Sequence, residues 1–350
     1  MSWRDGLRPL DLKRGRVELA HGAGGRAALQ LVEELFLPEL DNPALRTLDD
    51  GALLDAPPGH RLVVATDGHV VDPLFFPGGD IGCLAVHGTL NDVAMMGATP
   101  LALTASFVLE EGLPLADLHR IAVSMGQAAR AAGVPVVAGD TKVVQRGKGD
   151  GVFIATTGVG ALPAGRRLGA AWVRPGDRLL LSGPIGMHGV AVLSRRESLG
   201  FEAELQSDTA PLLGLVAALL AAVPEGTVHA LRDPTRGGVA ALLHEWARAA
   251  GVGFEIAEAV LPVPAAVHAA CELLGLEPLQ LASEGRLVAA VVPEAADAAL
   301  HALRGHPLGR DAVIIGHARA DPHRFVQMRT RLGGLRLVEW PVGEALPRIC

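Results

Sequence analysis

The stretch Leu74-Phe-Phe-Pro-Gly-Gly-Asp-Ile-Gly82 separates a β-rich run from a helical run, and this alternation decides the fold class. Before it, residues 61–66 (RLVVAT) predict a strand that ends at Asp67. After it, residues 81–96 have apolar side chains at helical spacing. Further along, strands are predicted at 101–109, 134–138 and 151–159, and a helix at 115–132. The sequence therefore predicts an α/β or α+β fold.

A chain of 350 residues is long for a single hydrophobic core. Residues 161–176 are rich in Pro, Gly and Arg, which is typical of a domain boundary. Beyond them we expect strands at 178–182, 253–256, 287–292 and 312–316, and helices at 189–198, 211–222 and 237–250. We predict an N-terminal domain over residues 1–162, a second domain over 163–328, and a mobile tail over 329–350.

Composition excludes several classes of protein. The net charge is −7, there is no tyrosine, and no basic run alternates with aromatic residues, all of which argue against a nucleic-acid binder. The three cysteines, Cys83, Cys271 and Cys350, are too far apart to indicate a disulfide framework or a zinc site. We find neither a membrane-length apolar run nor the apolar core of a signal peptide. We therefore expect a cytoplasmic enzyme with reduced thiols and no membrane partner.

Acidic residues recur directly after apolar strands or in tight turns. They are Asp49, Asp50, Asp67, Asp80, Asp92 and Asp140 in the first half, and Asp233 in the second. Each alone is also typical of a turn or a helix cap. Carboxylates that converge from different elements repel one another unless a cation is present, and hard oxygen ligands suit Mg²⁺ with phosphates. The recurrence predicts a magnesium–phosphate site.

Glycines and arginines beside these carboxylates fit phosphate handling. Residues 77–82 open a helix, whose free backbone N–H groups favour anions. Arg232 and Arg236 flank Asp233 and can offset charge on a transferring phosphoryl group. A P-loop is excluded because Gly147-Lys148 is followed by glycine. Residues 22–27 satisfy a loose dinucleotide-binding pattern, but no suitable second strand follows, so a glycine loop that faces phosphate or covers substrate is favoured.

Other side chains have two interpretations. Lys142 and Glu284 are candidates for proton transfer, or alternatively a surface lysine and a turn glutamate. For His87 and His188 we favour ordinary core or surface histidines. Cys350 ends the chain after a segment with a Gly-Gly pair, which predicts an extended arm that swings. A thiol on such an arm suggests a group carrier, although a terminal cysteine can also be accidental.

Five ordered blocks carry a family resemblance: residues 74–82, 88–100, 139–144, 232–238 and 346–350. In these blocks the chain resembles the HypE family of hydrogenase maturation proteins. That family belongs to the superfamily of aminoimidazole ribonucleotide (AIR) synthetase, selenophosphate synthetase and thiamine-phosphate kinase. The other members lack the terminal cysteine arm, so this arm favours HypE.

The resemblance implies a two-domain, AIR-synthetase-like (PurM-like) fold and a homodimer whose N-terminal sheets form a barrel-like core. It implies ATP and Mg²⁺ as cofactors, and ATP-dependent dehydration of a carbamoyl group on Cys350 to a thiocyanate. It also implies loading by the carbamoyltransferase HypF and transfer of cyanide to iron on a HypC–HypD complex, for [NiFe]-hydrogenase.

The resemblance also implies roles for individual residues. Metal contacts are expected from Asp49, Asp50, Asp67, Asp92, Asp140 and Asp233; nucleotide contacts from Asp50, Asp67, Gly79, Asp80, Asn91, Asp92, Asp140, Thr141, Arg232 and Arg236; and catalysis from Cys350, Lys142 and Glu284. The chain departs from the family pattern at Gly68-His69, His87 and Ser283. Two alternatives remain: a synthetase or kinase of the superfamily that acts on a diffusible molecule, and a non-catalytic carrier of Cys350.

Overall fold

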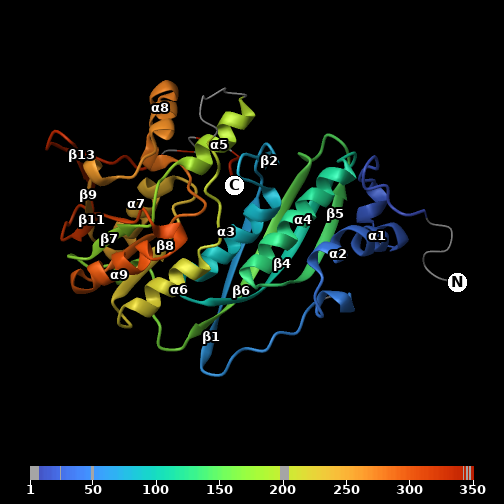
Figure 1. Ribbon diagram of the computed structural model, residues 1–350, viewed down its shortest axis with the longest axis horizontal. Coiled ribbons are helices and arrows are strands. Elements are labelled where there is room, and N and C mark those ends of the chain that lie inside the picture. The colour runs from blue at the N-terminus through green and yellow to red at the C-terminus, as the bar shows by residue number, and fades with distance from the viewer. Residues whose placement is uncertain are drawn as a thin grey trace.

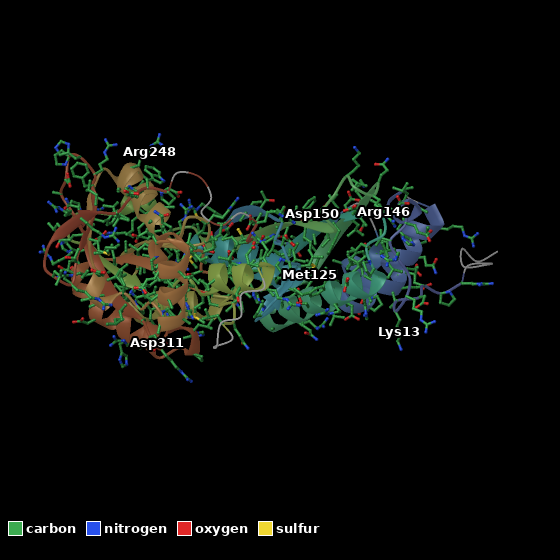
Figure 2. The ribbon with its side chains drawn as sticks, turned by 90° about the horizontal axis from the view of Figure 1, so that it is seen from above. Lys13, Met125, Arg146, Asp150, Arg248 and Asp311 are labelled. Atoms are coloured by element: carbon green, nitrogen blue, oxygen red, sulfur yellow. The ribbon has the colours of Figure 1, made fainter. Side chains whose placement is uncertain are left out.

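The molecule is elongated, and its two large β-sheets lie side by side along its long axis (Figures 1 and 2). A computed structural model describes residues 8–23, 25–48, 51–197, 205–341, 343, 346 and 348–350. The C-terminus lies between the two halves, close to helix α5 (Met187–Arg196) and strand β2 (Phe75–Phe76) (Figure 1). The last residues of the chain therefore meet both domains.

The first sheet has the strand order β1-β6-β4-β5. Its strands are β1 (His60–His69), β4 (Thr99–Glu110), β5 (Val136–Val144) and β6 (Val152–Pro163), and only β4 and β5 run parallel. Helices α3 (Ile81–Met95) and α4 (Leu115–Ala132) cover one face of this sheet (Figure 1). The short elements before and between them are η1 (Leu19–Gly22), α1 (Gly25–Leu31), a π-helical turn (Val32–Phe36), α2 (Leu37–Leu40), η3 (Leu45–Thr47) and β3 (Gly79–Asp80).

The opposite face of the first sheet is open. Successive side chains of a strand point to opposite faces. Thr156 lies on the covered face, where it is buried and donates its hydroxyl to the Ala85 carbonyl in α3. Val64, of the alternate set on β1, is 65% exposed. Strand register places Thr157, Ser106 and Asp140 on this open face as well.

The second sheet has seven strands in the order β13-β12-β9-β11-β7-β10-β8. They are β7 (Arg178–Leu181), β8 (Val228–Arg232), β9 (Gly253–Ala257), β10 (Val288–Val291), β11 (Val313–Arg319), β12 (Val326–Arg329) and β13 (Leu335–Leu337). Its helices are α5, α6 (Leu213–Ala222), α7 (Gly238–Ala250), α8 (Ala265–Leu274) and α9 (Ala296–Arg304). Both domains mix parallel and antiparallel pairing, so the fold is α+β.

Most predicted elements are present, with two differences that affect the site. Strand β1 continues to His69, so Asp67 lies inside the strand rather than at its end. Strand β13 pairs with β12 at the sheet edge, so residues 335–337 belong to the second domain rather than to a free arm. The glycine loop at residues 22–27 also has a packing reason: a side chain at Gly22 would meet the Val143 amide nitrogen at 2.3 Å. Close packing of η1 on β5 therefore excludes a larger residue there.

Candidate functional site

Four carboxyl groups come together where the two domains meet. Asp67 comes from β1 and Asp92 from α3, whereas Asp233 follows β8 and Glu284 lies in the loop before β10. Each of Asp92, Asp233 and Glu284 has its pKa raised by others of the group. This convergence was expected from the acidic pattern for the three aspartates, and the tertiary structure adds Glu284 to them.

Burial and mutual repulsion raise the pKa values of this cluster. Burial, followed by the charge of Asp67, raises the pKa of Asp92 to about 6. Burial, followed by the charge of Asp92, raises the pKa of Asp233 to about 7. The pKa of Glu284 is raised well above its ordinary value by burial and then by Asp233 and Asp208. The cluster therefore favours the binding of a cation.

Among the described residues around this cluster, Glu284 Oε1 is a buried acceptor without a hydrogen-bond donor, and Asp208 Oδ2 has only an ion pair. Asp208 accepts the Glu284 backbone N–H at 3.2 Å through its other oxygen, and Arg286 Nε lies 3.4 Å from Oδ2. His69 Nε2 lies 3.4 Å from Asp67 Oδ2. Such atoms are costly to bury, so their concentration here marks a functional site. Sequence reasoning missed Asp208, because no strand pattern precedes it.

The donor chemistry fits a hard divalent cation. Asp67, Asp92 and Asp233 offer oxygen ligands, and Glu284 Oε1 is an acceptor without a donor. Within the described residues, however, no three His, Cys, Asp or Glu side chains are gathered tightly enough to hold a metal by themselves. Mg²⁺ usually binds through a few carboxylates plus water and substrate phosphates, so a phosphate would have to complete any Mg²⁺ site on these oxygens. Asp49 and Asp50 lie outside the described residues.

Two residues that were predicted to contact the nucleotide, Asp80 and Gly79, make contacts within the protein instead. Asp80 caps α3 and accepts the backbone N–H groups of Gly82 and Cys83 at 2.7 and 3.2 Å. The first turn of α3 therefore does not offer those N–H groups to an anion, contrary to the expectation from residues 77–82. Gly79 packs against Phe76, Cys83 and Thr209.

Asn91 is likewise committed to the structure. It donates to the carbonyls of Ala210 and Glu284 and accepts the Leu212 N–H at 2.8 Å. It is fully buried, and these bonds join the two domains across α3. We therefore leave Asn91, with Gly79 and Asp80, out of the proposed ligand set.

The two arginines beside Asp233 differ. Arg232 forms an ion pair with Glu245 of α7. Arg236 lines a hollow of about 200 Å³ together with Trp340, Leu346 and Ile349 of the tail. The charges of Arg232 and, to a smaller extent, Arg236 lower the pKa of Asp92 against the larger effect of burial, but Arg232 is already held by its ion pair. Arg236 is therefore the cation better placed to meet a ligand between the cluster and the tail.

Asp140, Thr141 and Lys142 lie apart from the cluster. Lys142 Nζ donates to Asp140 Oδ1 at 2.7 Å, and this bond lowers the pKa of Asp140. Asp140 and Lys142 are exposed on β5, on the open face, whereas Asp67 faces α3 on the covered side. Within one chain, the predicted convergence of Asp140 with Asp67 is therefore wrong.

The tail is docked, which differs from the swinging arm expected from the sequence. Backbone N–H groups of Val70 and Asp72 donate to the carbonyl oxygens of Cys350 and Arg348 at 3.2 and 3.1 Å. Ile349 is buried in the core shared by the two domains. Cys350, half-buried, therefore lies beside the chain that leaves β1, within a few residues of Asp67.

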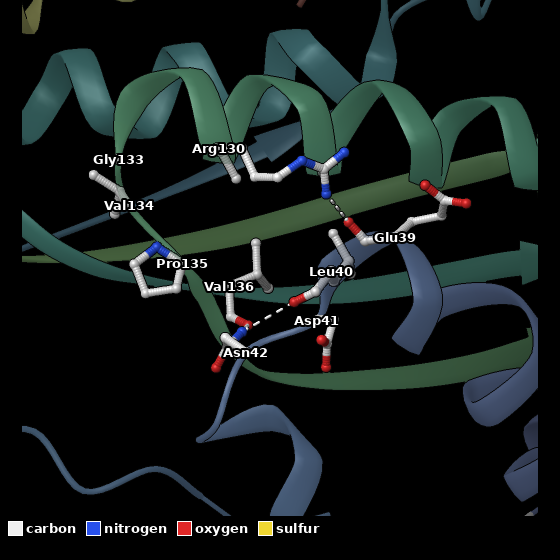
Figure 3. A pocket seen from close by; sticks show the side chains of 11 residues that line it. Glu39, Leu40, Asp41, Asn42, Arg130, Gly133, Val134, Pro135 and Val136 are labelled. Carbon is white, nitrogen blue, oxygen red and sulfur yellow. Dashed lines mark hydrogen bonds between the residues drawn. The ribbon is translucent and has the colours of Figure 1, made fainter.

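A second hollow, of about 220 Å³, lies beneath the end of α4 and is lined by none of the residues of the cluster (Figure 3). Arg130 closes it by donating to the Glu39 carbonyl at 2.6 Å, and Asn42 donates to the Val136 carbonyl at 2.7 Å (Figure 3). Asp41 is paired with Arg46. Because its charged groups already have partners, this hollow is a packing feature.

Comparisons with known proteins agree with this arrangement. The AIR synthase related protein N-terminal domain family matches residues 48–162, and the corresponding C-terminal domain family matches residues 174–329. The chain is thus a two-domain AIR synthase related protein. It is 61% identical to the carbamoyl dehydratase HypE of Cupriavidus necator, over 98% of this chain and 97% of that one. The chain belongs to the HypE family of carbamoyl dehydratases, which are hydrogenase maturation proteins.

Solved structures support the same assignment. A crystal structure of the hydrogenase maturation protein HypE in complex with ATP has a TM-score of 0.91 and 47% identity, covering 95% of this chain and 99% of that chain. HypE in a HypE–HypF complex has a TM-score of 0.78 and 47% identity, covering 89% and 99%. In the described part of the present chain, no helix is both long and apolar enough to cross a membrane.

Proposed function

We propose that this protein dehydrates a carbamoyl group carried on its own Cys350, using ATP, and so produces a thiocyanate. The observation that carries the proposal is the docking of Cys350 through its main chain onto the end of β1, the strand that carries Asp67 of the carboxylate cluster. Family membership supports the reaction class, and the ATP complex of a close relative supports the nucleotide. The product is a source of cyanide ligands for the iron of [NiFe]-hydrogenase.

The chemistry needs activation of a poor leaving group. The amide oxygen of the S-carboxamide bonds to the γ-phosphorus of ATP as the bond to ADP breaks, and one N–H proton is released. The C–O bond then breaks as the second N–H proton leaves, which gives S–C≡N and inorganic phosphate. Positioning and charge stabilisation supply most of the rate in such phosphoryl transfers.

Glu284 is the group we assign to proton removal. Burial and neighbouring carboxylates keep it protonated, so it becomes a base only after positive charge enters the cluster. Arg236 is placed to offset charge on the transferred phosphoryl group. We assign Mg²⁺ to Asp67, Asp92 and Asp233, with Asp49 or Asp50; when bound it neutralises phosphate charge. This coupling makes the base available only in a loaded site.

The open face of the first sheet supports a homodimer. Leu62 and Val64 of β1 are 56% and 65% exposed, and contiguous exposed apolar surface of this kind marks an interface. Packing two such faces together would form a barrel-like core and would cover Asp140 and Lys142. Lys142 then acts, if it handles protons at a thiol, in the site of the second chain.

The proposal also includes the partner proteins and the domain boundaries of this chain. We propose loading of Cys350 by HypF and delivery of cyanide to a HypC–HypD complex in the cytoplasm. The HypE–HypF structure of a relative supports the first step. Of the predicted domains at residues 1–162 and 163–328, we retain the first and extend the second through strand β13, so that the predicted tail at 329–350 is shortened to the residues after 337, which must undock for loading.

The test is intact-protein mass spectrometry of the carbamoylated chain before and after Mg-ATP, with Cys350→Ala alongside. We expect an ATP-dependent loss of one water from chains that retain Cys350. Carbamoylation that never loses water would reduce the protein to a carrier. Turnover of a diffusible substrate by a chain without its tail would favour a superfamily synthetase or kinase instead.

A further inference from the structure

The final three residues are held by their main chain. The carbonyl of Arg348 accepts from Asp72 N–H and from Arg196 Nη2 at 2.6 Å, the carbonyl of Ile349 accepts from His188 Nε2 at 2.5 Å, and Cys350 accepts from Val70 N–H. One side of this grip is the chain after β1. The other side is α5, which provides both His188 and Arg196. None of these contacts uses the cysteine side chain, so they hold the tail irrespective of what the thiol carries.

The surroundings of His188 fix its chemical state. A carbonyl oxygen can only accept, so Nε2 carries the proton and donates it to Ile349. Nδ1 then accepts from the Ser207 hydroxyl at 2.7 Å, while Ser207 Oγ accepts the Thr209 N–H. The ring packs edge-on against Phe76, with centroids 5.3 Å apart, and Asp208 faces it from the neighbouring loop. Full burial lowers the pKa of His188, in keeping with this neutral tautomer.

Arg196 joins both sides of the grip. Its Nε donates to the Asp72 carbonyl at 2.8 Å while its Nη2 holds the Arg348 carbonyl. Arg348 itself pairs with Asp72 and with Asp150. The helix, the segment after β1 and the tail thus form one connected unit.

We propose that His188 and Arg196 form a latch that seats the terminal cysteine in the interdomain site, which makes them positioning residues for dehydration. This proposal rests on the proposed function for its catalytic consequence, but not for the docking itself. The latch must close for dehydration and open for loading. Weakening it therefore slows dehydration without slowing loading, which a merely structural role would not do.

The first test measures docking without turnover. The rate of alkylation at Cys350 in the full-length, unloaded protein is followed by mass spectrometry of the C-terminal peptide, which separates it from Cys83 and Cys271. For His188→Ala we expect alkylation about tenfold faster, the effect of losing one buried hydrogen bond. His188→Gln, whose amide nitrogen can replace Nε2, should restore much of the protection. His229→Gln is the control, because His229 is similarly buried but bonds to Asp177 in the second domain.

The second test measures both half-reactions. In His188→Ala and Arg196→Ala we expect single-turnover dehydration to slow about tenfold, with carbamoyl loading unchanged or faster. Unchanged Cys350 alkylation in a folded His188→Ala protein would overturn the latch. Faster alkylation with no dehydration even in the unsubstituted chain would leave the latch standing and refute the proposed function instead. Equal slowing of loading and dehydration would indicate general damage and would also overturn the proposal.

Discussion

Aspartates on the two sides of the first sheet have pKa values that are shifted in opposite directions. On the covered side, burial and like charges near Asp67 raise the pKa values of Asp92 and Asp233 to about 6 and about 7. On the open side, Asp140 has its own lysine and a lowered pKa. Because Asp92 and Asp233 have too little positive charge around them, the covered side is predisposed to bind a cation. Because Asp140 and Lys142 already neutralise each other, the open side is predisposed to be covered by a second chain.

The largest effect on dehydration is expected from a substitution of Glu284. Glu284→Gln removes a buried proton acceptor and leaves the shape of the side chain, so we expect dehydration to slow by about 10²–10⁴-fold with the fold intact. Single-turnover mass spectrometry of the loaded chain measures this. Glu272→Gln on α8, where the side chain is 75% exposed, is the matched control. A near-normal rate in Glu284→Gln would remove the base from the covered side.

The pH dependence of stability tests the buried charges directly. With its pKa raised from 3.8 to about 7, folded Asp233 keeps its proton between those values while the unfolded chain releases it. Stability therefore falls, by up to a few kcal/mol, as pH rises through this window without divalent cations. Asp233→Asn should flatten the curve, and Mg²⁺ should restore stability to the unsubstituted chain. Denaturant titrations in a chelator measure this; a flat curve in the unsubstituted chain would contradict the electrostatic account.

A charged side chain introduced on the open side tests whether this face forms the dimer. Val64→Glu places a carboxylate in the proposed dimer face, and we expect the dimer dissociation constant to rise about 100-fold because a buried unpaired charge is costly. Sedimentation equilibrium measures the change. Leu273→Glu on α8, 71% exposed in the second domain, should leave assembly unchanged. If both variants assemble normally, the dimer uses another surface.

The smallest effect on stability is expected at Lys142. Its pair with Asp140 is exposed, so Lys142→Ala should change the unfolding free energy by less than about 1 kcal/mol. If Lys142 serves the second chain, mixing Lys142→Ala with Cys350→Ala chains should restore dehydration that neither variant shows alone. No restoration by mixed dimers would mean that Lys142 does not act on the thiol of the second chain.

Much of the fold and part of the site could be predicted from the sequence. The alternating strands and helices predicted an α/β or α+β architecture, and the recurrent aspartates predicted a convergent acidic site that includes Asp67, Asp92 and Asp233. Asp80 shows the limit of that reasoning: a carboxylate before a helix is equally suited to cap it, and here it does. Asn91 shows the same limit, because its side chain joins the domains instead of meeting a ligand.

The sequence by itself determined the residue types: acidic groups for a cation, a terminal thiol, and apolar periods that build two sheets. Only the tertiary structure decided which groups share an environment. It joined Asp208 and Glu284 to the cluster, put Asp140 and Lys142 on the far face, and bound the tail to His188. The physical reason is that ionisation and docking depend on burial and on partners distant in sequence, whereas local pattern specifies only which face of an element is apolar.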